Sequence, residues 1–177
     1  MNNLSFHITD ITANSIRANA SEIGLFVEEQ DRQILIRITD NGSGMDPETM
    51  ALVTNPFYTT RTTRKVGLGI PFLIQNAEQT GGSVSIKSDP GKGTEVVATF
   101  YSDHIDCPPW GDLSGTVAML ISANPDVNVS FQYRSERTPG YSICTDEIKE
   151  MLDGFPLSHP KVMLLLKELL EENIKGH

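Results

Sequence analysis

Apolar and polar positions alternate along two stretches near the start of the chain, residues 22–29 (EIGLFVEE) and 33–40 (QILIRITD). A period of two is typical of strands that bury one face. The short polar turn between the two stretches predicts an antiparallel hairpin. Two further strands are predicted at 83–88 and 94–102, joined by the Gly/Pro turn DPGKG.

Helical spacing governs other segments. Apolar residues recur on two arcs of residues 4–20, and this pattern predicts a mostly buried helix. One arc holds Leu4, Ile8, Ile11 and Ala18, and the other holds Phe6, Ala13, Ile16 and Ala20.

Two shorter helices follow. One begins at Asp46-Pro47, where the aspartate is a good cap and proline suits the first helical position. The other covers 70–80 and ends before Gly81-Gly82. Residues 54–69 between them show no periodicity, and a loop of that length within a compact domain is uncommon unless it is functional.

The order of these elements predicts an α+β fold, with helices over one face of a mixed, mainly antiparallel sheet. We assign residues 1–102 to this domain, the proline-interrupted segment 103–111 to a linker, and 112–177 to a small C-terminal α/β extension of unknown role. The elements expected in the extension are helices near 112–123, 146–152 and 160–174, and a hairpin of 127–134 with 140–145.

Composition limits the functional classes. Apolar residues make up 38% of the 177-residue chain and charged residues 21%, with no apolar run approaching the length of a membrane span. A formal net charge of −9 argues against sequence-independent binding to nucleic acid. The N-terminus lacks the features of a secretion signal, so a cytoplasmic location is expected. Cys107 and Cys144 have no partners at metal-ligand spacing, which predicts two free thiols.

Two polar patterns stand out against this background. His7, Asp10, Asn14 and Arg17 are three or four residues apart, so they share one face of the first predicted helix. The second pattern, Asp-Asn-Gly-Ser-Gly at 40–44, directly follows a predicted strand. By itself it is either ordinary turn chemistry or a loop that allows a ligand close to the backbone.

Four segments, taken in order, carry a resemblance to a known superfamily. They are DITANSIRANA (10–20), DNGSGM (40–45), NPFYTTR with VGLGI (55–61 and 66–70), and GKGTEVVATF (91–100). Together they resemble the GHKL ATPases, the Bergerat-fold group of gyrase, heat-shock chaperones, histidine kinases and MutL. The resemblance covers about residues 4–102, is closest to histidine kinases, and implies a domain that binds ATP with Mg²⁺.

The resemblance also implies roles for individual residues. Asn14 corresponds to the amide that holds magnesium, and Asp10 stands where the family usually has Glu or Asn to orient or deprotonate water. Asp40 corresponds to the carboxylate that accepts from the adenine amine, where guanine would present a carbonyl. Gly42 and Gly44 allow close approach to the base, and Thr94 lies near the adenine.

Further residues are assigned to the phosphates. Arg17 is expected either to contact phosphate or to be solvated, and His7 is expected to be a partly exposed helix histidine rather than a phosphoacceptor. The loop and the start of the next helix supply backbone N–H groups and positive charge. The residues assigned in the loop and helix start are Thr59, Thr60, Arg61, Lys65, Gly67, Leu68 and Gly69. Lys65 replaces a glycine of the kinase pattern.

These assignments predict a stand-alone histidine kinase-like ATPase or phosphotransferase that acts on a separate partner protein. The predicted magnesium helix begins so close to Met1 that a preceding helical hairpin with its own phosphorylated histidine is not expected; His104 is the alternative acceptor within the chain. Hydrolysis should be slow, because Asp10 is shorter than glutamate by about 1.5 Å. The other functions considered are an ATP-gated interaction module with little catalysis and an anti-sigma-type protein-serine kinase.

Overall fold

The computed structural model describes residues 3–55, 57 and 69–174. Within them, helices and strands occur where the sequence predicts them, with small shifts at their ends. The helices are α1 (Leu4–Arg17), α2 (Pro47–Val53), α3 (Gly69–Gln79), α4 (Leu113–Ala123), α5 (Thr145–Leu152) and α6 (Pro160–Asn173). The strands are β1 (Glu22–Gln30), β2 (Gln33–Asp40), β3 (Ser83–Asp89), β4 (Gly93–Tyr101), β5 (Asn128–Ser135) and β6 (Tyr141–Cys144).

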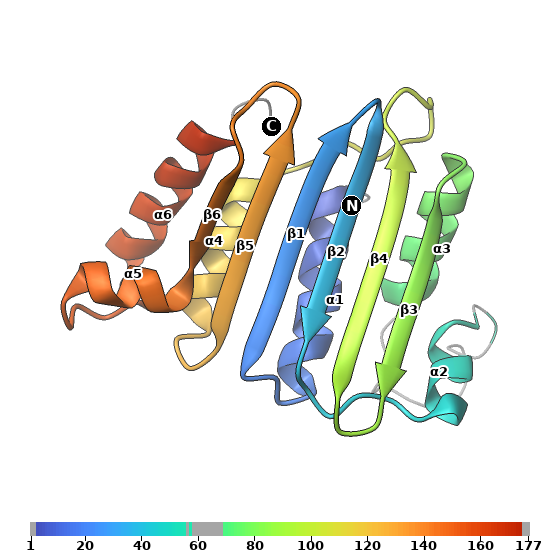
Figure 1. Cartoon of the computed structure of the whole chain (residues 1–177), viewed down its shortest axis with the longest axis horizontal. Helices are drawn as coiled ribbons and strands as arrows, with labels where there is room; N and C mark the ends of the chain where they lie inside the picture. Colours follow the sequence, from blue (N-terminus) through green and yellow to red (C-terminus); the bar gives the residue numbers. More distant parts are fainter. Residues whose placement is uncertain (1–2, 56, 58–68, 175–177) are drawn as a thin grey trace.

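All of the described strands belong to one six-stranded sheet in the order β3-β4-β2-β1-β5-β6 (Figure 1). Each neighbouring pair is antiparallel except β1 and β5, which run parallel. Antiparallel neighbours follow from short turns, whereas the parallel pair needs a crossover, and α4 lies within the connection from β4 to β5. The predicted mixed, mainly antiparallel sheet is therefore confirmed.

Among the described residues, helices cover one face of this sheet. Figure 1 shows α1, α3 and α4 behind the strands, with the opposite face open. Burial alternates accordingly along β1, β2 and β5, and the helix-facing side chains are Ile23, Leu25, Val27, Ile34, Ile36, Ile38, Val129, Phe131 and Tyr133. On the open face, the guanidinium carbons of Arg37 and Arg134 lie 5.8 and 5.6 Å from the ring centre of Phe26. The α+β sandwich predicted from the sequence is confirmed.

The segment at 109–111 contacts the start of α1. The backbone N–H groups of Leu4 and Ser5 donate to the carbonyls of Pro109 and Trp110, each at 2.9 Å. The Ser5 hydroxyl also donates to the Trp110 carbonyl, at 2.6 Å. These bonds satisfy N–H groups that the first turn of a helix leaves without intrahelical partners. The C-terminal residues thus complete the N-terminus of α1 as well as extend the sheet.

Helix α1 differs from the prediction in two respects. It ends at Arg17 rather than at residue 20, because Asn19 adopts a left-handed backbone with φ 56°, a conformation that asparagine tolerates better than most residues. Its second apolar arc is only partly buried, and Phe6 is 46% exposed. Among the described helices, none combines the length and the apolar composition that crossing a bilayer requires.

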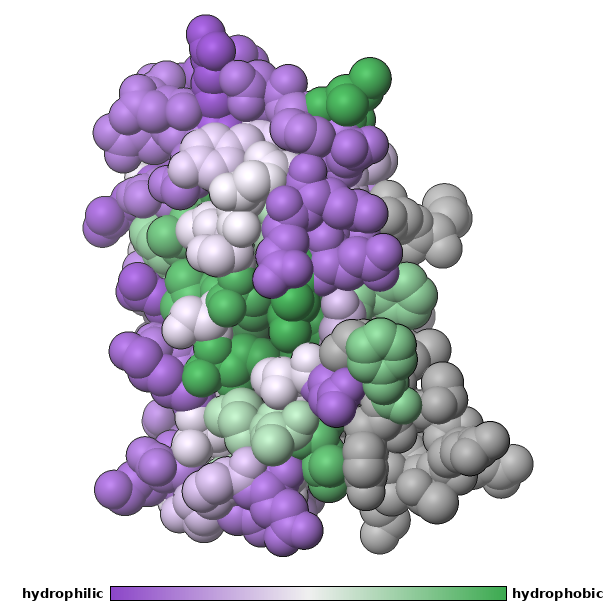
Figure 2. Space-filling model, turned by 90° about the vertical axis from the view of Figure 1, so that its right-hand side faces the viewer, coloured by the Kyte–Doolittle hydropathy of each residue, from purple (hydrophilic) through white to green (hydrophobic). Residues whose placement is uncertain are grey.

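The β3 edge of the sheet is viewed in Figure 2, where an apolar band runs between polar surfaces. Val84 and Ile86 of β3 and Ile74 of α3 are partly buried and pack against the core. Because β3 is an edge strand, its helix-facing side chains are covered on one side only.

Candidate functional site

A cavity of about 230 Å³ lies between the C-terminal half of α1 and the neighbouring ends of β2 and β4. Its lining combines apolar side chains from the core with a few polar ones. The lining residues are Ile11, Asn14, Ser15, Arg17, Ala18, Ile38, Asp40, Ser43, Gly44, Met45, Thr49, Val53, Ile70, Thr94 and Val96. Ligand pockets for whole drug-sized molecules start at about 300 Å³, so this space suits a base and sugar rather than a complete nucleotide.

Asp40 is held in place at one wall of the cavity. The Ser15 hydroxyl donates to Asp40 Oδ2 at 2.6 Å, and the Gly42 backbone N–H donates to Oδ1 at 2.9 Å. An ionised carboxylate has about four acceptor positions, so each oxygen can still accept another hydrogen bond. On the neighbouring strand, Thr94 is the register partner of Asp40.

Ser15 was not assigned a role from the sequence. It is 2% exposed, and its hydroxyl fixes the carboxylate that the resemblance assigns to the base. The signal available in the sequence was its position: Ser15 directly follows Asn14 and is four residues after Ile11, so it faces inward from the same helix.

Close packing in the structure explains why the loop after β2 has glycine at positions 42 and 44. A Cβ on Gly42 would lie 2.8 Å from the Ala18 Cβ. Gly44 has a φ of +66°, and a Cβ there would lie 1.9 Å from the Asp89 carbonyl oxygen. The loop therefore packs directly on the end of α1 and on the β3–β4 turn, which fixes its shape before any ligand binds.

Ser88 connects this loop to β4. Its hydroxyl accepts from the Met45 backbone N–H at 2.8 Å and lies 2.8 Å from the Thr94 hydroxyl. The Gly91 N–H donates to the Ser43 carbonyl at 2.7 Å. The cavity wall is thus cross-linked by hydrogen bonds between two segments about 45 residues apart in sequence, Ser43–Met45 and Ser88–Gly91.

The polar face of α1 forms the opposite wall. Asn14 and Arg17 both line the cavity, and Arg17 Nη2 donates a hydrogen bond to Asn14 Oδ1. Asp10 lies one turn earlier, where a Cβ on Gly69 would be 3.0 Å from its carboxylate. Burial raises the pKa of the Asp10 carboxyl, while the charge of Arg17 opposes that shift. Asp10 therefore sits against the N-terminus of α3.

The Asn14 amide oxygen fits a magnesium ion that keeps water and phosphate ligands. The described residues contain no group of three or more His, Cys, Asp or Glu side chains that could hold a metal. Mg²⁺ is commonly held by only one or two protein oxygens, with substrate phosphates and water completing the octahedron. One amide oxygen at Asn14 meets that requirement, whereas an all-protein cage is not built from the residues described.

His7 is not the partly exposed histidine that was expected. Its side chain is 3% exposed, its ring stacks on Phe100 with centres 6.5 Å apart, and Nε2 lies 2.8 Å from Asn76 Nδ2. Burial lowers the pKa of His7. The prediction was wrong because His7 lies next to the residues of α1 that face the core, although its spacing also matches that of the polar residues Asp10 and Asn14.

The predicted phosphate-contacting residues divide into two groups. Gly69 is described, and it begins α3 and is buried. Six others lie outside the described residues: Thr59, Thr60, Arg61, Lys65, Gly67 and Leu68. Their roles stay predictions.

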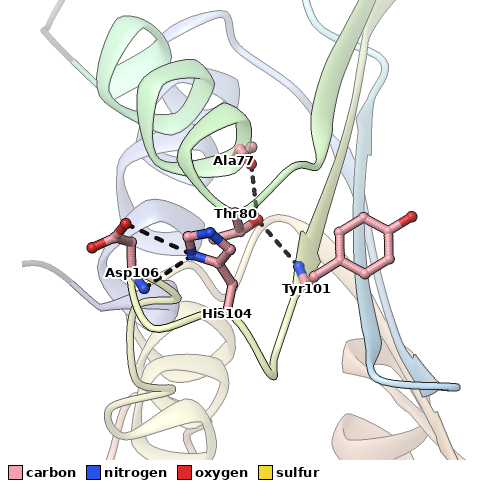
Figure 3. Close-up of polar contacts among 5 residues, drawn as sticks. All are labelled: Ala77, Thr80, Tyr101, His104 and Asp106. Carbon is pink, nitrogen blue, oxygen red and sulfur yellow. Dashed lines mark hydrogen bonds and ion pairs between the residues drawn. The ribbon is translucent and has the colours of Figure 1, made fainter.

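His104 lies far from the cavity. It follows Tyr101 at the opposite end of β4 from Thr94, and seven residues of a strand span about 23 Å. Figure 3 shows its ring beside Asp106, with Thr80 bridging Ala77 and Tyr101. The Asp106 N–H donates to His104 Nδ1 at 3.1 Å, so that nitrogen already serves as an acceptor. A ligand in the cavity of the same chain is out of reach of His104.

Comparison with known proteins gives a family match over this region. The sequence profile described as "Histidine kinase-, DNA gyrase B-, and HSP90-like ATPase" matches residues 3–104. The sensor kinase/phosphatase CqsS of Vibrio cholerae serotype O1 is 35% identical over 42% of this chain and 11% of its own length. SrrB of Staphylococcus aureus is 31% identical over 51% of this chain and 17% of its own. Sensor histidine kinase ZraS of Salmonella typhimurium is 29% identical over 49% and 19%, respectively.

A solved structure shows the same fold over more of the chain. The N-terminal domain of a DNA repair protein aligns with a TM-score of 0.58 and 16% sequence identity, covering 81% of this chain and 52% of that one. The chain spans between 11% and 19% of the three sensor proteins it resembles.

Proposed function

Because this chain belongs to the family of histidine kinase-, DNA gyrase B- and HSP90-like ATPases, we propose that it binds ATP with Mg²⁺, with the base and sugar in the cavity between α1, β2 and β4. We further propose that it transfers the terminal phosphoryl group slowly, to water or to a separate protein. The observation that carries the proposal is that Asp40 and Asn14, far apart in sequence, line one cavity.

Asp40 would recognise the base. Ser15 and Gly42 fix its carboxylate and leave acceptor positions free, so it can accept from the exocyclic amine of adenine. Guanine would present a carbonyl oxygen there, which the carboxylate would repel. The apolar lining, including Ile38, Val53 and Val96, would contact the faces of the base.

Asn14 and Asp10 would act on the phosphate side. Asn14 would hold the metal through its amide oxygen, and bound Mg²⁺ would neutralise phosphate charge. The raised pKa of Asp10 makes its carboxylate a better proton acceptor once ionised. Its short side chain, close against Gly69, limits its reach toward an attacking water.

The acceptor would belong to another protein. His104 is out of reach, and His7 is buried against Asn76. Two of the relatives reported, CqsS and ZraS, are named as sensor kinases, which supports phosphoryl transfer as the activity class.

Calorimetric titration of the full chain with ATP and GTP, each with saturating MgCl₂ and with EDTA, tests the binding site. We expect ATP to bind more tightly than GTP, and Mg²⁺ to strengthen ATP binding. Asp40→Asn should weaken ATP binding by about tenfold or more, the effect of about 1.4 kcal/mol. Asp126→Asn, an exposed carboxylate in another turn, is the matched control and should change nothing. ATP affinity weaker than about 1 mM in every condition would reject the proposal.

A second candidate, a nucleotide-gated interaction module without turnover, is favoured by the position of Asp10 against Gly69. Release of labelled phosphate from ATP separates the two. Turnover that Asp10→Asn removes while leaving ATP affinity intact supports an enzyme. Tight binding with no release, in the wild type as in the variant, supports the module.

A further inference from the structure

Arg17 lies between two hollows of the surface. On one side it lines the cavity that also contains Asn14 and Asp40. On the other it lines a groove of about 600 Å³ between α1, α4 and α6, whose walls include Ile16, Met119 and Met163. The side chain is exposed, so its position is not fixed by packing.

In this structure the guanidinium bonds to the amide oxygen of Asn14, the oxygen that would hold Mg²⁺. An asparagine amide has a single oxygen with two lone pairs, so a metal ion and a guanidinium bound to it together would lie close to each other. A guanidinium carries a permanent positive charge, so it cannot share that oxygen with a divalent cation at close range without strong repulsion. Arg17 and the metal should therefore compete for Asn14.

The rest of the site fits a cation at this position. The charge of Arg17 also lowers the pKa of the Asp10 carboxyl, against the larger raising effect of burial. A positive charge near Asn14 and Asp10 is thus present before any metal binds. The groove gives the guanidinium a solvated place to move to, so its departure from Asn14 requires no rearrangement of the core.

We propose that Arg17 is a positioning residue that holds the Asn14 amide in place of the divalent cation and is displaced when Mg²⁺ binds with ATP. This inference rests on the proposed function. It gives Arg17 a role that differs from a simple phosphate contact, because a phosphate contact persists beside the metal, whereas this one is exchanged for it.

The test is the ratio of the ATP dissociation constants measured without and with saturating Mg²⁺, in the wild type and in Arg17→Gln. The variant removes the competitor, so we expect the ratio to rise by about fivefold, the effect of one hydrogen bond from a charged group at an exposed position. Arg17→Lys should raise the ratio less, since it keeps the charge. Arg134→Gln, on the open face of the sheet, is the matched control and should leave both constants unchanged.

Two outcomes overturn the proposal while leaving ATP binding in place. If Arg17→Gln weakens ATP binding equally with and without Mg²⁺, the residue is a phosphate contact only. If the ratio falls, the arginine assists the metal rather than competing with it. Failure of the wild type to bind ATP at all would instead count against the proposed function.

A readout without nucleotide tests the contact itself. The side-chain amide signals of Asn14 in a ¹⁵N-labelled, metal-free sample should shift in Arg17→Gln and stay in place in Arg134→Gln. Unchanged Asn14 signals in Arg17→Gln would show that the bond does not form in solution and would also overturn the proposal.

Discussion

At the scale of single residues, the site depends on groups that hold the ligand-facing side chains in position. Ser15 and the Gly42 N–H together fix both oxygens of Asp40. A carboxylate that is oriented before the ligand arrives loses less conformational entropy on binding. The sequence pointed to Asp40 through a resemblance, whereas the position of Ser15 showed only that it faces inward and not which side chain its hydroxyl meets. Only the register of α1 against β2 shows that the two side chains meet.

His7 gives stability a dependence on pH. Burial lowers its pKa in the folded state, so below its unfolded pKa of about 6.5 the unfolded chain binds more protons than the folded one. The free energy of unfolding should therefore fall as the pH drops from about 6.5 toward the lowered folded value, by at most about 1.4 kcal/mol per pH unit. Urea denaturation between pH 5 and 8 measures this slope.

The groups around His7 define the control. Within the described part of the chain its ring contacts Phe6, Phe100 and the neutral amide of Asn76, none of which carries a charge. Asp10, one turn along α1, has a raised pKa and acts in the opposite direction, but around the lower range where carboxylates titrate. His7→Gln should flatten the slope near pH 6. An equal slope in the variant would assign the effect to other groups.

At the scale of elements, the loop after β2 is rigid because it packs against two other segments. Gly44 and Gly91 both have left-handed backbones, with φ of +66° and +76°. A Cβ at Gly44 would overlap the Asp89 carbonyl, whereas at Gly91 nothing lies within 4 Å. Gly91→Ala should cost about 1 kcal/mol for the backbone conformation alone, and Gly44→Ala more than about 3 kcal/mol. Chemical denaturation of the two variants compares them.

The same pair connects stability to binding. Gly44→Ala has to move the loop that holds Asp40, so it should weaken ATP binding as well, while Gly91→Ala should leave it near the wild-type value. Equal losses of stability in both variants would show that the loop can shift away from Asp89 and is not rigid.

Most elements could be predicted from the sequence because they carry local signals. Asp46 caps α2 through a bond from the Thr49 N–H at 2.7 Å, and Pro47 takes the first position, as expected. Alternation in β1 and β2, with the short polar turn between them, predicted both strands and their antiparallel pairing. Alternation specifies which face a strand buries but not which strand lies beside it, so the parallel pairing of β1 with β5 could not be read from the pattern.

At the scale of the whole molecule, the family match and the sheet end at different places. The match covers residues 3–104, while β5 pairs with β1 along eight register positions, from Glu22–Asn128 to Glu29–Ser135. The C-terminal residues also supply the carbonyls that the first turn of α1 uses. The division of the chain at 103–111 stays a prediction. A domain boundary there would have to interrupt the β1–β5 pairing and the hydrogen bonds to the first turn of α1.

Removing residues 105–177 tests how far the N-terminal region depends on the remainder. The fragment 1–104 would lose the partner strand of β1 and the carbonyls of Pro109 and Trp110, and would expose the side of α1 against which α4 packs. A loss of only 2–3 kcal/mol shifts the unfolding midpoint of a domain of this size by about 10 °C or more. We therefore expect the midpoint of the fragment, followed by circular dichroism, to fall by at least that amount. Fragment 1–111 restores the carbonyls of Pro109 and Trp110 without β5 or α4. Its midpoint should therefore lie between those of fragment 1–104 and the full chain, and it measures how much the hydrogen bonds to the start of α1 contribute to stability. A midpoint for 1–104 equal to that of the full chain would mean that the N-terminal region is an independent domain, and that the β1–β5 pairing contributes nothing to its stability.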